Sequence, residues 1–149
     1  MTDIALTVNK ESVYEEVVQT TSYTGAKMDD ELAYNRIFTT DEDKSMLERF
    51  WSESKNTVCN SLKKTLLNEV EEAGVYQLSL GVSSSFDKAL TESMQRSLFS
   101  FFVMNITAKW YTFTNKEEAT GYATEAATYM EDIMRKVFFK KRPTRPTYD

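Results

Sequence analysis

Apolar residues recur along the chain at two spacings, which predict short extended segments followed by helices. Ile4, Leu6 and Val8 alternate with polar neighbours, as expected of a short strand or extended arm. Asn9 follows directly and is a suitable N-cap for a short helix. We therefore expect an N-terminal arm and a short helix within residues 1–30.

Three longer stretches carry apolar residues at three- or four-residue steps, which is the period of an amphipathic helix. The first is predicted to span 40–73, with Thr40 as its N-cap and Gly74 as its C-terminal stop. A central helix is predicted over 86–113, and a last helix over 115–142. The second half of the central helix is apolar on nearly all sides, so we expect it to be buried.

Between the first two long helices, the pattern changes to alternation. Tyr76, Leu78 and Leu80 alternate with polar residues within Val75 to Val82, which predicts a β arm. Proline disfavours the helical conformation in the preceding residue, so the last helix is expected to end before Pro143. The predicted fold is mainly α. It is a helical bundle of three to four helices with one or two short β arms, forming a single domain over 1–142 with an extended C-terminal tail over 143–149.

Charge is unevenly distributed along the 149 residues. The total is −5, but residues 135–149 hold six basic residues against Asp149 alone, a net charge of +5 that leaves −10 for the remainder. Such asymmetry is typical of a chain with an interaction tail. One cysteine excludes an intrachain disulfide and indicates a reducing compartment, and the N-terminus lacks the pattern of a secretory signal. The longest apolar run, Leu98 to Phe113, is too short and too interrupted for a membrane helix, so no membrane association is expected.

Few residues are available for catalysis. The absence of histidine, together with a single cysteine, excludes zinc sites built on Cys and His and the common nucleophile systems. Paired carboxylates could serve a metal-dependent enzyme, but they lie at helix starts and polar faces, where solvated charge is expected. No phosphate-binding glycine motif is present. Cys59 lies beside an apolar stripe and is interpreted as a small hydrophobe. We predict no catalysis, no cofactor and no metal.

Aromatic residues cluster in the central helix and at the start of the first long helix. With Lys109 as the only interleaved basic residue, a core or subunit interface is favoured over a nucleic-acid stacking platform. Part of this apolar surface exceeds what one small monomer buries, which favours an oligomer. The candidate core or interface aromatics are Phe50, Trp51, Phe99, Phe101, Phe102, Trp110, Tyr111 and Phe113.

The basic C-terminal tail has three interpretations. It is a nucleic-acid arm, a frayed end without a specific role, or an arm that docks on a partner. Docking is favoured, because prolines stiffen an extended backbone and acidic faces of neighbouring subunits complement the arginines. The candidate docking residues are Arg142, Pro143, Arg145, Pro146 and Tyr148.

Four segments in this order resemble a known family. A helix enters at TTDEDKSMLERFW, an aromatic helix FFVMNITAKWYTF and an alanine-bearing helix EEATGYATEAATYMEDIM follow, and the basic end KKRPTRPTY completes the layout. This layout resembles the head–tail connector (neck adaptor) proteins of long-tailed bacteriophages. The resemblance covers about Ser22 to Tyr148.

The resemblance implies a virion structural protein without catalysis, located in the neck and in the host cytoplasm during assembly. It implies a homo-oligomeric dodecameric ring between portal and tail proteins, with DNA passing through the lumen without specific binding. The C-terminal segment would reach a neighbouring subunit or the portal. The β arms, Asp3 to Val8 and Val75 to Val82, would extend sheets across subunits by strand addition. The alternative is a small helical nucleic-acid-binding or regulatory protein that uses its basic tail.

Overall fold

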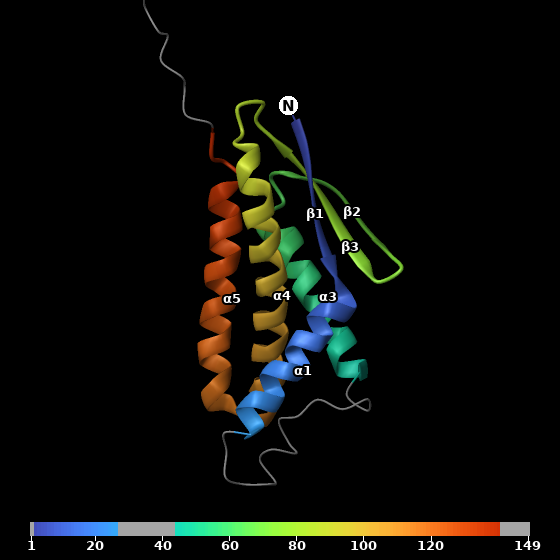
Figure 1. Cartoon of the computed structure of the whole chain (residues 1–149), viewed down its shortest axis with the longest axis vertical. Coiled ribbons are helices and arrows are strands. Elements are labelled where there is room, and N and C mark those ends of the chain that lie inside the picture. Colours follow the sequence, from blue (N-terminus) through green and yellow to red (C-terminus); the bar gives the residue numbers. More distant parts are fainter. Residues whose placement is uncertain (1, 27–43, 141–149) are drawn as a thin grey trace, which may run out of the picture.

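The computed structural model describes residues 2–26 and 44–140, and these form four α-helices and one three-stranded sheet (Figure 1). The mainly α prediction is confirmed. In chain order the elements are β1 (Thr2–Asn9), α1 (Lys10–Ala26), α3 (Lys44–Ser61), β2 (Leu66–Glu72), β3 (Val75–Val82), the 3-10 helix η2 (Lys88–Leu90), α4 (Thr91–Thr114) and α5 (Lys116–Lys136).

The N-terminal strand and helix follow the predicted pattern. Ile4, Leu6 and Val8 of β1 point into the core, and the Asn9 side chain accepts a hydrogen bond of 3.0 Å from the Ser12 amide to cap α1. The buried Val17 and Thr21 lie one turn apart on α1, and the Thr21 hydroxyl donates to the Val17 carbonyl at 2.9 Å. The helix ends at Ala26, within the range of 1–30 predicted for the N-terminal arm and short helix.

The long helix predicted over 40–73 is wrong in its second half. Among the described residues, α3 ends at Ser61, a turn follows, and Leu66–Glu72 is strand β2. The four-residue spacing from Leu62 through Leu66 to Val70 is equally compatible with this arrangement. Ala73 and Gly74 adopt φ values of 52° and 80° and form a tight hairpin, so residues 66–72 pair with β3 instead of continuing the helix. Gly74 is thus a hairpin residue and not a helix stop.

The sheet has the order β1-β3-β2, and both pairings are antiparallel. The β3 strand confirms the predicted β arm, but both of its edges are occupied within the same chain. Strand addition by Val75 to Val82 across subunits is therefore wrong. Strand β1 pairs with β3 from Thr2 to Asn9, and the amide of Thr7 on β1 donates to Gln95 Oε1 of α4 at 3.3 Å.

The two long C-terminal helices form an antiparallel pair, with the sheet on the other side of α4 (Figure 1). The central helix begins at Thr91 and not at 86, because Asp87 caps the short helix η2 through the Ala89 amide at 3.1 Å. The last helix ends at Lys136 and not at 142. Lys140 instead forms an extended bridge with Phe86, and the Phe139 carbonyl accepts from the Asp87 amide at 3.3 Å.

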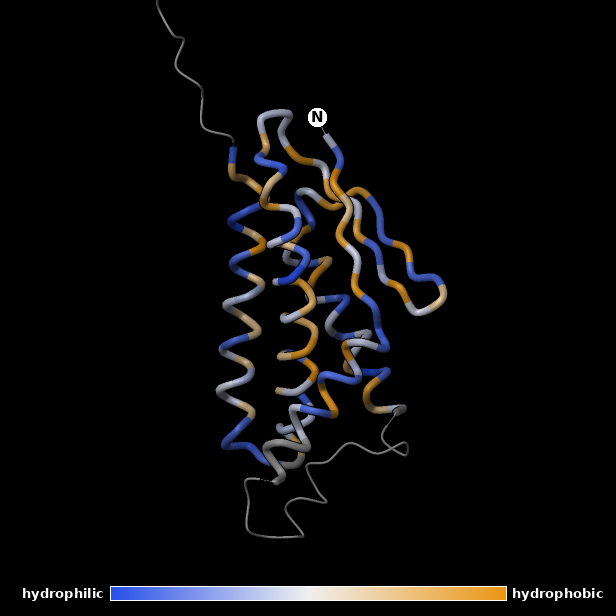
Figure 2. Tube along the Cα trace, in the orientation of Figure 1, coloured by the Kyte–Doolittle hydropathy of each residue, from blue (hydrophilic) through white to orange (hydrophobic). Residues whose placement is uncertain are grey.

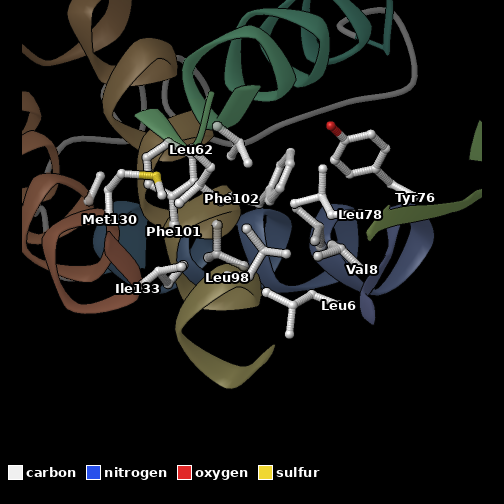
Figure 3. Packing of buried hydrophobic residues seen from close by; sticks show 14 of the residues in the cluster. Leu6, Val8, Leu62, Tyr76, Leu78, Leu98, Phe101, Phe102, Met130 and Ile133 are labelled. Atoms are coloured by element: carbon white, nitrogen blue, oxygen red, sulfur yellow. The ribbon is translucent and has the colours of Figure 1, made fainter. Parts of the chain in front are cut away.

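The core lies around α4, which contacts α1, α3, α5 and β1. Apolar residues line the inward sides of these elements, while polar residues dominate the outward side of α5 (Figure 2). Phe102 of α4 packs against Trp51 of α3 with ring centroids 4.6 Å apart, and Tyr76 of β3 completes this group at 5.9 Å from Phe102. Phe101 and Leu98 of α4 lie near Met130 and Ile133 of α5 (Figure 3).

Candidate functional site

The predicted site residues are the docking residues of the tail and the core or interface aromatics. The docking residues of the tail, Arg142, Pro143, Arg145, Pro146 and Tyr148, lie outside the described residues. Most of the predicted aromatics belong to the core of the chain itself, which decides between the core and interface alternatives for them. The buried ones are Phe50, Trp51, Phe101, Phe102, Trp110 and Tyr111, whereas Phe99 is half-buried.

Phe113 is the exception among these aromatics. It lies in the last turn of α4, and its side chain is 72% exposed. One face of the ring stacks on Phe50 of α3, with an interplanar angle of 11° and centroids 6.3 Å apart. The rest of the ring faces outward. We call this part of the molecule the Phe113 end; it comprises the last turn of α4 and the first turn of α5.

Titratable side chains gather where the edge strand β2 passes over α3. Trp51 Nε1 and Lys55 Nζ donate to the two carboxylate oxygens of Glu71, each at 2.7 Å. Two positions earlier on β2, Glu69 accepts hydrogen bonds from the Cys59 thiol and the Tyr76 hydroxyl. Glu69 and Glu71 are alternate residues of β2, so both side chains lie on the same face of the strand.

The electrostatics of this cluster favour a structural role. Hydrogen bonds from Cys59 and Tyr76 lower the pKa of Glu69. Burial raises the pKa of Glu71, but the hydrogen bonds from Lys55 and Trp51 outweigh burial and lower the pKa overall. Burial raises the pKa of the Cys59 thiol, and the Glu69 carboxylate raises it further. A protonated thiol is a poor nucleophile. The cluster therefore joins β2 to α3 without providing an activated nucleophile.

A groove with an apolar floor opens at the opposite end of the molecule from Phe113. It lies between the end of α3 with its following turn, residues 60–65, and the last part of α5, and its volume is about 320 Å³. Leu62 and Val137 form buried parts of the floor, while Met134 is 40% exposed and Phe138 is 63% exposed. We call this feature the basic-end groove, because Lys63 and Lys64 are exposed along it.

Further basic residues surround the basic-end groove. Arg135, Lys136 and Lys140 follow one another at the end of α5 and beyond it. Lys136 is bound to Asp132 at 2.9 Å and to the Ser93 hydroxyl at 2.6 Å, so its charge is compensated. Arg135 and Lys140 are exposed, and the chain passes from Lys140 into the basic tail. This end combines positive charge with uncovered apolar side chains.

Sequence reasoning missed the basic-end groove for two reasons. Lys63 and Lys64 were placed inside a long helix, so their position at the end of an element was not expected. Phe138 and Phe139 were assigned to the last helix, although both are exposed beyond its final turn. Two adjacent aromatics directly before a basic segment were a signal that was available in the sequence.

A second groove, of about 470 Å³, lies between the junction of β1 and α1 and the first half of α4. Its lining is mixed in character, with Glu92 and Arg96 carrying opposite charges beside the half-buried Phe99. Gln95 within it is already bonded to the Thr7 amide. These properties do not favour one class of ligand, so the basic-end groove is the stronger candidate site.

Neither a metal centre nor a membrane span is found in residues 2–26 and 44–140. No group of three or more Cys, Asp or Glu side chains in these ranges is arranged to hold a metal ion. No helix within them has the length and apolar character needed to cross a membrane. Comparisons with protein family models, curated proteins and solved structures gave no match.

Proposed function

We propose that this chain is a virion structural protein that forms a head–tail connector ring between portal and tail, without catalysis. The observation that carries the proposal is that the described core packs fully around α4, while Phe113, Met134 and Phe138 stay exposed at its two ends. Exposed aromatic and methionine side chains are typical of protein interfaces. The order of segments that resembles the neck adaptor proteins selects the connector among possible assemblies.

In this proposal the fold acts as a helical bundle with an extended C-terminal docking tail. The tail continues from Lys140 at the basic end, and its arginines, Arg142 and Arg145, bind an acidic face of a neighbouring subunit or of the portal. Pro143, Pro146 and Tyr148 provide a stiff backbone and an apolar contact for the same interface. The proposed location is the virion neck, and the host cytoplasm during assembly.

DNA passes through the lumen of the proposed ring without specific binding. Outside residues 135–149 the chain has a net charge of −10. A lumen lined by carboxylates repels phosphates, which lets the duplex slide without adhering. A ring structure with a basic lumen would contradict this part of the proposal.

A second candidate function is nucleic-acid binding through the basic tail. One observation favours it: Lys63, Lys64 and Arg135 are exposed at the end of the molecule from which the tail departs. Together with the tail they offer enough cations for salt-sensitive phosphate contacts. This candidate predicts a monomer or small oligomer with measurable affinity for DNA.

Solution mass and electron microscopy of the full chain, alone and mixed with a portal ring, test the two candidates. A connector gives rings, or a monomer that joins only the portal ring. Binding to a labelled duplex at increasing salt is measured in parallel, with a chain that ends at residue 140 for comparison. Strong salt-dependent binding that is lost in the shortened chain, without any ring, would support the second candidate and overturn the first.

A further inference from the structure

Two of the exposed apolar sites in the described part of the chain lie at opposite ends of the molecule, and their properties are complementary. One is a protruding aromatic ring, Phe113; the other is the basic-end groove with Met134 and Phe138 at its mouth. We propose that Phe113 of one copy inserts into the basic-end groove of a second copy, so that subunits associate end to end. This inference rests on the homo-oligomer in the proposed function, but not on its location in a virion.

The groove has room for an aromatic side chain. Its volume of about 320 Å³ is near the lower limit of the roughly 300–1,000 Å³ found for ligand clefts. Leu62, Met134 and Val137 supply an apolar floor, and Phe138 supplies a ring for edge or stacked contact. Phe113 is anchored on one side by Phe50, so its ring is held in place for insertion.

The contact cannot form within one chain. Phe113 lies in the last turn of α4, and the antiparallel helix α5 then carries the chain to Met134 and, two residues beyond its end, to Phe138 at the other end (Figure 1). A helix of 21 residues spans about 30 Å at 1.5 Å per residue. Because the two helices pack along their length, this separation is fixed. The partner of each site must therefore lie on another molecule.

Charge favours the same pairing. Lys63 and Lys64 are exposed along the groove, while Glu117 and Glu118 are exposed in the first turn of α5, close to Phe113 in the chain, and outweigh the exposed Lys116 beside them. Insertion of Phe113 brings these opposite charges toward each other. The chain's own tail is the other nearby segment, but its Lys141, Arg142 and Arg145 carry the same sign as the groove, which disfavours it as the occupant.

An interface between two different surfaces of the same chain is heterologous. Such contacts repeat from copy to copy, and they either close into a ring or continue as a filament. Each subunit contributes one Phe113 and one groove, so every added copy leaves the same pair of surfaces available. The inference thus names the surfaces through which the proposed homo-oligomer forms.

Charge reversal tests the proposal in the full chain. Variant K63E/K64E makes the groove acidic, and variant E117K/E118K makes the Phe113 end basic; each is expected to weaken self-association about tenfold or more. A mixture of the two is expected to recover assembly, because each end then meets a surface of opposite sign. Association is measured by sedimentation velocity over a concentration series, and urea unfolding checks that each variant is folded.

Two further variants complete the experiment. F113S is expected to weaken self-association, and mixing F113S with either charge variant should not restore assembly. K88E replaces an exposed lysine outside the groove lining, so it is the matched control and should assemble like the unaltered chain.

If the unaltered chain assembles and neither charge variant changes its mass, the end-to-end contact is overturned while the proposed ring survives. A chain that stays monomeric at all concentrations, alone and with a portal ring, overturns both. Loss of assembly on removing residues 141–149, with F113S unaffected, assigns the contact to the tail and also overturns the inference.

Discussion

Two phenylalanines of α4 occupy contrasting environments, although they lie on the same face of the helix. Phe113 is about three turns beyond Phe102, which returns it to nearly the same direction. Phe102 is fully buried, whereas Phe113 is 72% exposed. Trp51 of α3 and Tyr76 of β3 cover Phe102, whereas Phe50 of α3 stacks on one face of Phe113.

The difference shows that burial of an α4 side chain depends on which elements pack over that position, and not only on the face of α4 from which the side chain extends. The sheet and the middle of α3 cover the centre of α4, so aromatics there hold the fold together. The end of α4 extends beyond that cover. An aromatic residue of the same type at that position contributes little to folding and remains available for association.

The largest effect is expected for Phe102→Ala. Removing a fully buried ring that contacts Trp51, Tyr76 and Phe101 leaves a cavity in the core. The expected loss is about 3–5 kcal/mol in the free energy of unfolding, measured by urea denaturation. A loss below about 1 kcal/mol would contradict the packing described around α4.

A smaller effect is expected from removing the carboxylates of Glu69 and Glu71, which hold β2 against α3. Strand β2 pairs with β3, whose Tyr76 covers Phe102. The pKa values of Glu69 and Glu71 are lowered in the folded state from an ordinary value of 4.5. Their contribution is therefore present above that value and is lost as pH falls through the lower folded pKa. We expect the Glu69→Gln, Glu71→Gln double variant to lose about 1–2 kcal/mol at pH 7 and much less at pH 3.

Urea midpoints at pH 7 and pH 3 measure this difference. Glu72→Gln is the matched control, because Glu72 is an exposed carboxylate on the same strand with its side chain on the other face. Equal losses for the double variant at both pH values would show that the hydrogen bonds of Glu69 and Glu71 are not the source of the effect.

A further effect concerns the hairpin that brings β2 and Tyr76 into register. Ala73 has a φ of 52°, a conformation that asparagine and glycine adopt more readily than alanine. Ala73→Asn is expected to stabilise the protein by about 0.5 kcal/mol. Gly74→Ala is expected to destabilise it by about 1 kcal/mol. An added Cβ at Gly74 meets no atom within 4 Å, so the loss arises from its φ of 80° alone. Thermal unfolding measures both, and equal signs would refute the turn assignment.

The smallest effect on folding is expected for Phe113→Ser. The ring stacks on Phe50 but is 72% exposed, so the free energy of unfolding should change by about 0.5 kcal/mol or less. Urea unfolding at a concentration where the chain is monomeric measures this change in folding stability without a contribution from self-association. A loss comparable to that of Phe102→Ala would remove the contrast on which the account is built.

Much of the fold could be predicted from local patterns. Alternation located β1 and β3, and the helical period located α4 and α5, with the end of α4 and the start of α5 each predicted to within one residue. The segment after Ser61 could not be assigned, because Leu62, Leu66 and Val70 satisfy a helical stripe, and Gly74 is equally suited to a helix stop and to the hairpin turn that pairs this segment with β3. The end of α5 was misplaced because the bridge between Phe86 and Lys140 joins distant parts of the chain.

Less of the candidate site could be predicted. Phe113 is among the predicted core or interface aromatics. The sequence alone could not show that Phe113 is exposed while Phe102 is buried, because both belong to one continuous apolar run. The basic-end groove is formed by residues 60–65 and Met134 to Phe138, two segments that only the tertiary fold brings together. The polar contacts of Glu69 and Glu71 were hidden for the same reason, because β2 was not recognised as a strand.

The most direct measurement of the central claim is chemical crosslinking between the two ends. Cys59→Ser removes the single thiol, and a new cysteine is then placed either at exposed Thr112, beside Phe113, or at exposed Asn60, on the groove. The account predicts that a short bis-maleimide joins the two variants when they are mixed and joins neither variant to itself. Absence of the mixed dimer, or equal crosslinking of each variant with itself, would contradict end-to-end association.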